Sequence, residues 1–391
     1  MNKDRIEMAY YSYVRVENKM YFSHIFFNGL FEMNLDDFSV KFICRFPEVD
    51  AREFCLHGMG QAVEYKNRIY FFPLNCRFIH SYDIEGGDIK GILLPMETPI
   101  ETDRYFLGAY KWINKDKVWL FSRILSKGVF IFDLNSQDIQ RDDILTNSLA
   151  KYQTITNFIE TPNGKLYTCS LPDNILIEVK VDERQVKEYP IPIGSVKISS
   201  INYRKEAFVF ADKYTGGVYE WKLGDKCAHI FMADKEERMS LKEAPFSLCC
   251  YGNNEMYIFP SRDKNIMKIA SDSGLVKKAA DYPEDFYFTN KWDEIAQFPA
   301  FGACEIMGDE IWLHPCIGNK LLIFNTKSNY IIGKELSIDI SEVFPYEGQH
   351  YESQKISLES FCHRIKKTGI DSQSMERFEG EKIYDYLIKY F

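Results

Sequence analysis

A short pattern of polar and apolar positions recurs along the chain. It consists of a charged residue, an aliphatic or small residue, an aromatic residue and then a residue that is usually apolar, as in Lys19-Met20-Tyr21-Phe22. We call this pattern the anchor. Its seven copies carry their aromatic residue at Tyr21, Tyr70, Trp119, Tyr167, Phe208, Tyr257 and Trp312, in steps of 41 to 55 residues. A repeat of this length is typical of the blades of a β-propeller, which span roughly 40–50 residues each.

Each anchor has the same surroundings. An apolar strand precedes it, the anchor forms a second strand, and a third strand follows after a turn. Asp, Asn and Gly then mark another turn, and a more polar fourth strand ends the unit, as in 40–46 and 185–190. The clearest copy of the last three strands is 164–192. Four strands with a polar outer strand are typical of a propeller blade.

We therefore predict an all-β protein, a seven-bladed β-propeller of four-stranded antiparallel blades over residues 1–342. The ring is expected to close by packing of faces, without a strand shared between the first and last blades. Residues 343–391 are predicted to be a helical C-terminal extension that packs on the propeller. Within it, apolar residues recur at helical spacing at Leu358, Phe361 and Ile365 and again at Ile383, Leu387 and Tyr390. The extension either caps the ring or recruits a partner protein.

The anchor, the third strand that ends near Asp or Asn, and the Lys/Glu-rich fourth strand resemble the broad group of kelch-like, NHL-like and streptogramin-lyase-like propellers. The resemblance covers about residues 8–338. It implies the fold and transfers no functional residue, because no Gly-Gly doublet follows the anchor and no unit ends in Trp-Asp.

Composition narrows the classes of partner. The chain has 391 residues, 48 basic and 57 acidic, and its net charge of −9 argues against binding to the phosphates of nucleic acid. No apolar run reaches the ~18 residues of a membrane span, so we expect no membrane contact. The ten cysteines are scattered. Their pattern favours buried thiols in a reducing compartment, and we predict a cytoplasmic location.

The turns between second and third strands share one face of a propeller with the links that follow each fourth strand. We call this the loop face, and it is the expected binding surface. Its turns hold seven basic and three acidic residues, which favours an anionic ligand held by paired Arg and Lys contacts. The predicted ligand-binding residues are Arg77, Arg123, Lys213, Arg262, Lys264 and Lys320. Asn28, Asn174, Asn265 and Asn319 also recur there, and their simplest role is turn formation.

Three histidines are expected near one another at the loop face. His24 and His314 end second strands of units one and seven, and His57 begins unit two. Such a set can bind a divalent metal or supply acid–base catalysis, with Glu305 on the adjacent inner strand. The alternative is that each histidine is a hydrogen-bonded structural residue.

The leading functional prediction is a non-catalytic scaffold that binds a small anionic or saccharide ligand, or a partner protein, without a cofactor. The alternative is a propeller lyase or hydrolase with a catalytic or metal site at His24, His57 and His314. No phosphate-binding glycine loop, nucleophile elbow or zinc-protease motif is present in the sequence.

Overall fold

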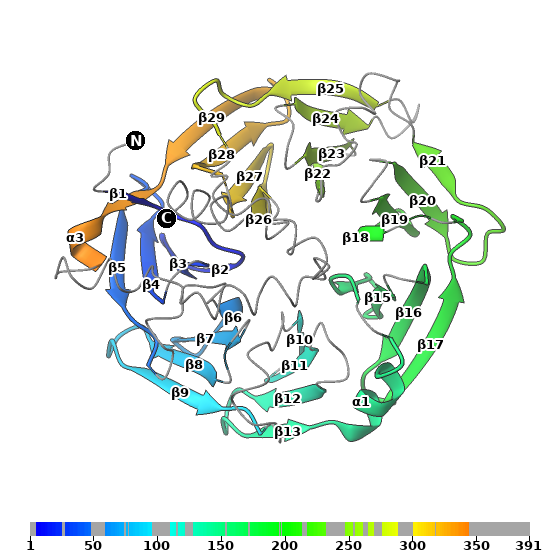
Figure 1. Cartoon of the computed structure of the whole chain (residues 1–391), viewed down its shortest axis with the longest axis horizontal. Helices are drawn as coiled ribbons and strands as arrows, with labels where there is room; N and C mark the ends of the chain where they lie inside the picture. The colour runs from blue at the N-terminus through cyan, green and yellow to red at the C-terminus, as the bar shows by residue number, and fades with distance from the viewer. Residues whose placement is uncertain are drawn as a thin grey trace, which may run out of the picture.

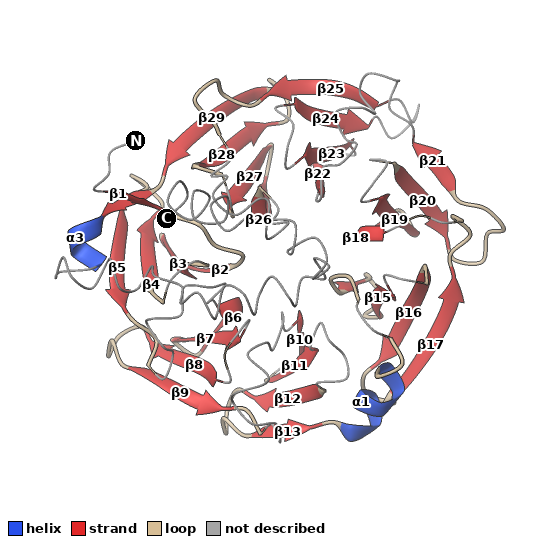
Figure 2. Cartoon of the chain, in the orientation of Figure 1, coloured by secondary structure: helices blue, strands red, loops and turns tan. Residues whose placement is uncertain are grey.

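The structure, a computed structural model, is a ring of seven four-stranded antiparallel sheets (Figure 1). It describes residues 5–25, 28–47, 59–73, 76, 78–95, 110–114, 116–121, 128–152, 155–170, 173–194, 196, 198–212, 217–231, 247–252, 255–260, 265–269, 276–287, 300–316 and 318–343. Strands dominate every blade, and the two short helices of the described residues lie at the rim (Figure 2). The predicted seven-bladed propeller is confirmed, whereas the predicted extension 343–391 lies outside the described residues except for Val343.

Strand order in each blade follows the sequence from the inner to the outer edge. Blade one contains β2 (Tyr13–Val16), β3 (Lys19–Ser23), β4 (Leu30–Asn34) and β5 (Val40–Cys44). Blade two contains β6 (Met59–Tyr65), β7 (Arg68–Pro73), β8 (Phe78–Asp83) and β9 (Ile89–Leu93). Blade three contains β10 (Tyr110–Asn114), β11 (Lys117–Phe121), β12 (Val129–Asp133) and β13 (Ile139–Arg141), followed by the helix α1 (Asp143–Leu149).

Blades four to seven repeat this plan. Blade four contains β14 (Ile159–Glu160), β15 (Leu166–Ser170), β16 (Ile175–Lys180) and β17 (Gln185–Pro190). Blade five contains β18 (Ile198–Arg204), β19 (Ala207–Asp212), β20 (Val218–Lys222) and β21 (His229–Phe231). Blade six contains β22 (Ser247–Gly252), β23 (Glu255–Pro260), β24 (Asn265–Ile269) and β25 (Val276–Asp281). Blade seven contains β26 (Phe301–Met307), β27 (Glu310–Pro315), β28 (Lys320–Asn325) and β29 (Tyr330–Glu335).

The aromatic residues of the anchor join neighbouring blades. Five of them pack against a ring of the following blade, in the pairs Tyr21–Tyr82, Tyr70–Phe132, Tyr167–Phe208, Tyr257–Phe324 and Trp312–Phe38, with centroids 4.9–6.1 Å apart. Tilted and edge-on geometries of this kind add to the gain from burying the rings. The recurrence seen in the sequence is thus a consequence of blade-to-blade packing.

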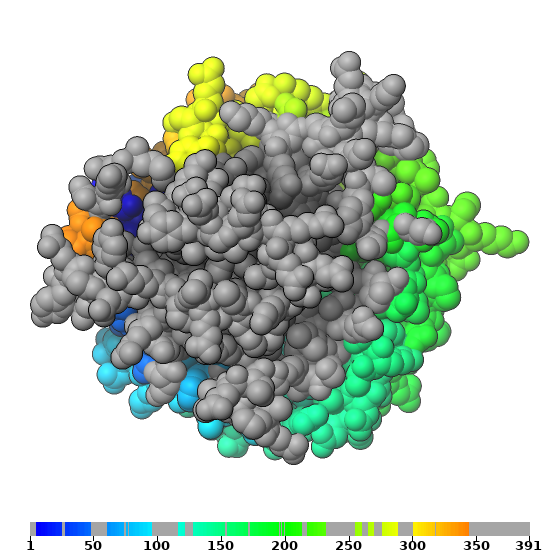
Figure 3. All heavy atoms as spheres, in the orientation of Figure 1, coloured from blue at the N-terminus to red at the C-terminus, as the bar shows by residue number. Residues whose placement is uncertain are grey.

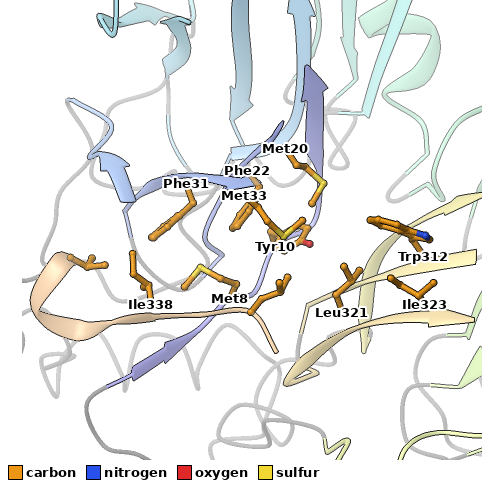
Figure 4. Packing of buried hydrophobic residues seen from close by; sticks show 12 residues of the cluster. Met8, Tyr10, Met20, Phe22, Phe31, Met33, Trp312, Leu321, Ile323 and Ile338 are labelled. Carbon is orange, nitrogen blue, oxygen red and sulfur yellow. The ribbon is translucent and has the colours of Figure 1, made fainter. Parts of the chain in front are cut away.

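The chain ends meet at a seam between blades seven and one. Neither blade borrows a strand, as predicted, but β1 (Arg5–Glu7) and β30 (Ser337–Asp339) form an additional two-stranded sheet that was not predicted. The helix α3 (Ile340–Val343) follows β30. Next to this sheet lies a buried hydrophobic cluster that includes Met8, Phe22, Phe31, Leu321 and Ile338 (Figure 4).

The described part of the chain contains free cysteines and short helices. The six cysteines whose side chains are described are free thiols; Cys169 and Cys316 are buried and Cys227 is exposed. No helix in the described part of the chain is long and apolar enough to span a membrane.

Candidate functional site

The two described histidines of the predicted triad are enclosed by the protein. His24 follows β3 and is 3% exposed, and its Nε2 lies 3.1 Å from the carbonyl oxygen of Glu7. His314 on β27 is fully buried, and its Nδ1 lies 3.0 Å from the hydroxyl oxygen of Tyr10. Burial lowers the pKa of each imidazole to about 3, so both rings are neutral at physiological pH. His57 lies outside the described residues.

A polar network surrounds His314 at the seam. The Tyr13 hydroxyl donates to Glu305 Oε2 over 2.9 Å, and Arg15 Nη1 lies 3.6 Å from Glu305 Oε1. His314 Nε2 lies 4.0 Å from Glu305 Oε2, and it has no hydrogen-bond partner among the described residues. Burial, and then the charge of Glu305, raise the pKa of Tyr13 well above its usual value.

This network is suited to holding one carboxylate between blades. An imidazole with a pKa near 3 is a weak base that carries no extra proton to donate at neutral pH, and a phenol with a raised pKa stays protonated and is a weak acid. Tyr10 is fully buried, and burial raises its pKa strongly as well. Tyr10, Tyr13 and Arg15 were not singled out from the sequence, because they belong to no motif and only the packing of blade one against blade seven brings them to His314 and Glu305.

Metal binding by the histidines has no geometric support in the part of the chain that is described. Within those residues, no group of three or more His, Cys, Asp or Glu side chains converges as metal ligands would. His24 and His314 each face an oxygen of the N-terminal segment instead, at Glu7 and Tyr10.

The basic candidates of the loop face are described at one position only. Lys320 begins β28 and forms an ion pair with Asp285, which belongs to the link between blades six and seven. The Asp285 carboxyl has a lowered pKa, chiefly because it accepts a hydrogen bond from Lys320. Arg77, Arg123, Lys213, Arg262 and Lys264 lie outside the described residues.

The pairing of Lys320 with a link residue has a wider parallel in the sequence. The five long links 47–57, 95–105, 142–152, 233–244 and 282–298 hold sixteen acidic and seven basic residues. Propeller topology places these links on the same face as the basic turns. By sequence, these links are acidic on balance whereas the turns are basic on balance, and most of both lie outside the described residues, so the electropositive face stays a prediction.

The recurring asparagines tie turns to links. Asn28 donates to the Phe46 carbonyl over 2.9 Å and accepts from the Phe46 amide over 2.8 Å. Asn319 does the same at the link after blade six, donating to Asp285 O and accepting from Tyr287 N. Asn174 donates to Gly194 O over 2.7 Å. Their predicted structural role is confirmed at these three positions, where each side chain bonds a turn to the backbone of a neighbouring segment.

Comparison with known proteins bears on the fold alone. No protein-family profile matches the sequence, and no curated protein matches it significantly. Among solved structures, virginiamycin B lyase from Staphylococcus aureus superposes with a TM-score of 0.54 at 12% identity, covering 80% of this chain and 96% of that one. A structure of YCF48 bound to D1 peptide gives 0.54 at 8% identity, covering 85% and 94%.

The resemblance is confirmed at the level of fold. A second lyase structure, a catalytically inactive histidine-to-alanine variant with quinupristin, matches equally well, with a TM-score of 0.54 at 12% identity over 81% of this chain and 94% of that one. At these identities the likeness shows a shared propeller and no shared activity.

Proposed function

We propose that this protein is a non-catalytic binding protein that recognises a partner on its loop face. The observation that carries the proposal is the burial of His24 and His314, which are neutral and already bonded to the N-terminal segment. Groups in this state serve the fold and are poorly placed to reach a substrate.

Mixed charge on the loop face favours a protein partner over a small anion or a saccharide. A surface that pairs its own bases with its own acids, as Lys320 does with Asp285, offers little net attraction to a lone anion. A protein surface presents charges of both signs and can match such a pattern. The peptide-bound structure of YCF48 shows that a propeller of this fold can hold a polypeptide.

The test is an affinity capture that compares surface variants. The Arg77→Glu, Arg262→Glu double variant reverses two charges of the loop face and is expected to lose a partner that the unmodified protein retains. Lys327→Glu is the matched control, because Lys327 is exposed and lies in the turn between β28 and β29, on the opposite face. It is expected to retain the partner.

Two results contradict the proposal. Retention of every partner by the loop-face variant removes the proposed surface. A divalent metal that copurifies with the protein and is lost in the His57→Ala and His24→Ala variants supports the catalytic alternative instead. Titration calorimetry with citrate and inorganic phosphate examines the small-anion alternative directly, since these probes bind only if the basic side chains have spare contacts.

A further inference from the structure

A cavity of about 380 Å³ lies between blades three and four. Its rim is formed by Asp116, at the turn between β10 and β11, and by Asp182 and Arg184, in the turn between β16 and β17. These are turns between first and second strands and between third and fourth strands, so the cavity opens away from the loop face. Blade four is the blue-green to green part at the lower right of the ring in Figure 3. The cavity is therefore separate from the surface of the proposed function.

The floor of the cavity is apolar. Trp119 and Val181 line it and are 7% and 6% exposed, and Ile131 completes it. All three belong to, or pack against, one hydrophobic cluster between the two blades, so their side chains are held in place by neighbours. A rigid apolar floor of this kind and a volume above ~300 Å³ are common features of small-molecule sites.

One basic group at the rim is fixed in position. Arg184 Nε lies 2.9 Å from Asp142 Oδ2, and Asp142 is almost fully buried because it also caps α1. This ion pair neutralises Asp142. It holds the guanidinium at the cavity while the two terminal nitrogens of Arg184 have no hydrogen bond to any described residue. Arg184 presents these donors in a planar fork that matches a carboxylate.

The side chains of Asp116, Lys117 and Asp182 can each form further hydrogen bonds. Asp182 and Lys117 are exposed, and neither has a side-chain hydrogen bond or a close ion pair within the described ranges. Asp116 accepts one hydrogen bond, from Asn135 Nδ2 over 2.7 Å. Outside the Asp142–Arg184 pair, two carboxylates and one ammonium group surround the apolar floor, and the paired Arg184 still has its terminal nitrogens as donors. A ligand of a single charge would bring like charges together at this rim.

We propose that this cavity binds a small zwitterion with an apolar body, of the size of a free α-amino acid. The ammonium group lies between the carboxylates of Asp116 and Asp182. The carboxylate accepts from Lys117 and from the terminal nitrogens of Arg184. The apolar side chain packs on Trp119 and Val181. Each charged group of the rim then has a partner of opposite sign, and the floor is covered by apolar surface.

The test is titration calorimetry of the full chain with leucine, methionine and phenylalanine, each compared with its amide and with the acid that lacks the amine. We expect at least one amino acid to bind with a Kd below about 10 mM, a weak but measurable affinity. Its amide and its deaminated acid should each bind at least about tenfold more weakly, since each loses a charge-assisted contact.

Variants locate the site. Asp182→Asn and Lys117→Gln should each weaken binding about tenfold, because each removes one charge from the rim. Lys222→Gln, an exposed lysine of blade five, is the matched control and should leave the Kd unchanged. The proposal is overturned if none of the three amino acids binds, if an amide binds as tightly as its parent, or if both rim variants bind normally. None of these results bears on the loop face, so this site and the proposed function are tested separately.

Discussion

The seam between blades seven and one differs from the ordinary contact between blades two and three. The contact between blades two and three is a continuous apolar cluster that includes Tyr70, Phe72, Val118 and Phe132. The seam has a comparable cluster, but it also has the β1–β30 sheet, two buried histidines and a carboxylate bridged by Tyr13. Imidazole, carboxylate and phenol groups, which are costly to bury, therefore occur where the ring closes.

The difference has a physical reason in the chain itself. Blades two and three are joined by a covalent link, so their relative position is restrained before any contact forms. Blades seven and one are far apart in sequence, and closing so long a loop costs conformational entropy that contacts must repay. Backbone hydrogen bonds across the seam offset part of this entropy cost. Met8 N donates to Leu336 O and Tyr10 N donates to Pro315 O, both over 2.9 Å. Closure without a shared strand thus relies on the N-terminal segment.

The largest expected effect is at Gly302, where the seam is tightest. A Cβ atom at this position would lie 2.3 Å from the Tyr10 carbonyl oxygen and 2.6 Å from Tyr11 Cα. Both neighbours are backbone atoms, which cannot rotate away. We expect Gly302→Ala to lower the free energy of unfolding by about 3 kcal/mol, measured by urea denaturation.

A glycine outside the seam is the control for this prediction. A Cβ atom at Gly86, in the turn after β8, would approach only the Asp83 side chain, at 3.4 Å. Gly86→Ala should therefore change the free energy of unfolding by less than about 1 kcal/mol. Equal losses in the two variants would show that the seam is no more constrained than a surface turn.

The sequence predicted the blades better than the seam, for reasons visible at these residues. The anchor aromatics repeat because at least five of the interfaces place a ring at the same point, so the seven copies form a detectable period. Ile6, Gly302 and Ile338 act once each, at a contact between residues more than 290 positions apart. A single contact leaves no period to detect. His24 and His314 were placed at the correct strand ends, but their direction, inward to Glu7 and Tyr10, follows from packing alone.

Acid should weaken the seam before the ordinary interfaces. The folded pKa values of His24 and His314 are about 3, below the unfolded value of 6.5, so the unfolded chain binds more protons between these limits. Stability is full above pH 6.5 and falls as the pH drops through this window, by about 1 kcal/mol for each histidine at pH 5.5. Urea denaturation at pH 7.0 and 5.5 measures the loss.

Hydrogen exchange at pH 5.5 shows where that loss occurs. After correction for intrinsic rates, the amides of β1 and β30 should exchange faster at pH 5.5 than at pH 7.0. The amides of β11 and β12 should keep the same protection at both pH values. The His24→Gln, His314→Gln double variant should flatten the dependence of stability on pH. An unchanged slope in that variant would assign the acid sensitivity to other groups.

The smallest expected effect comes from single hydroxyl groups that cross the two interfaces. Tyr13 donates across the seam to Glu305 over 2.9 Å, and Tyr65 donates from blade two to Asn135 of blade three over 2.8 Å. The seam bond has a charged acceptor and is partly buried, whereas the other bond is exposed and neutral. Tyr13→Phe should therefore cost about 1.5 kcal/mol and Tyr65→Phe about 0.5 kcal/mol, both by urea denaturation. If Tyr65→Phe proves the more costly change, the polar network of the seam does not stabilise closure, and its carboxylate and neutral histidine would need a role beyond the fold.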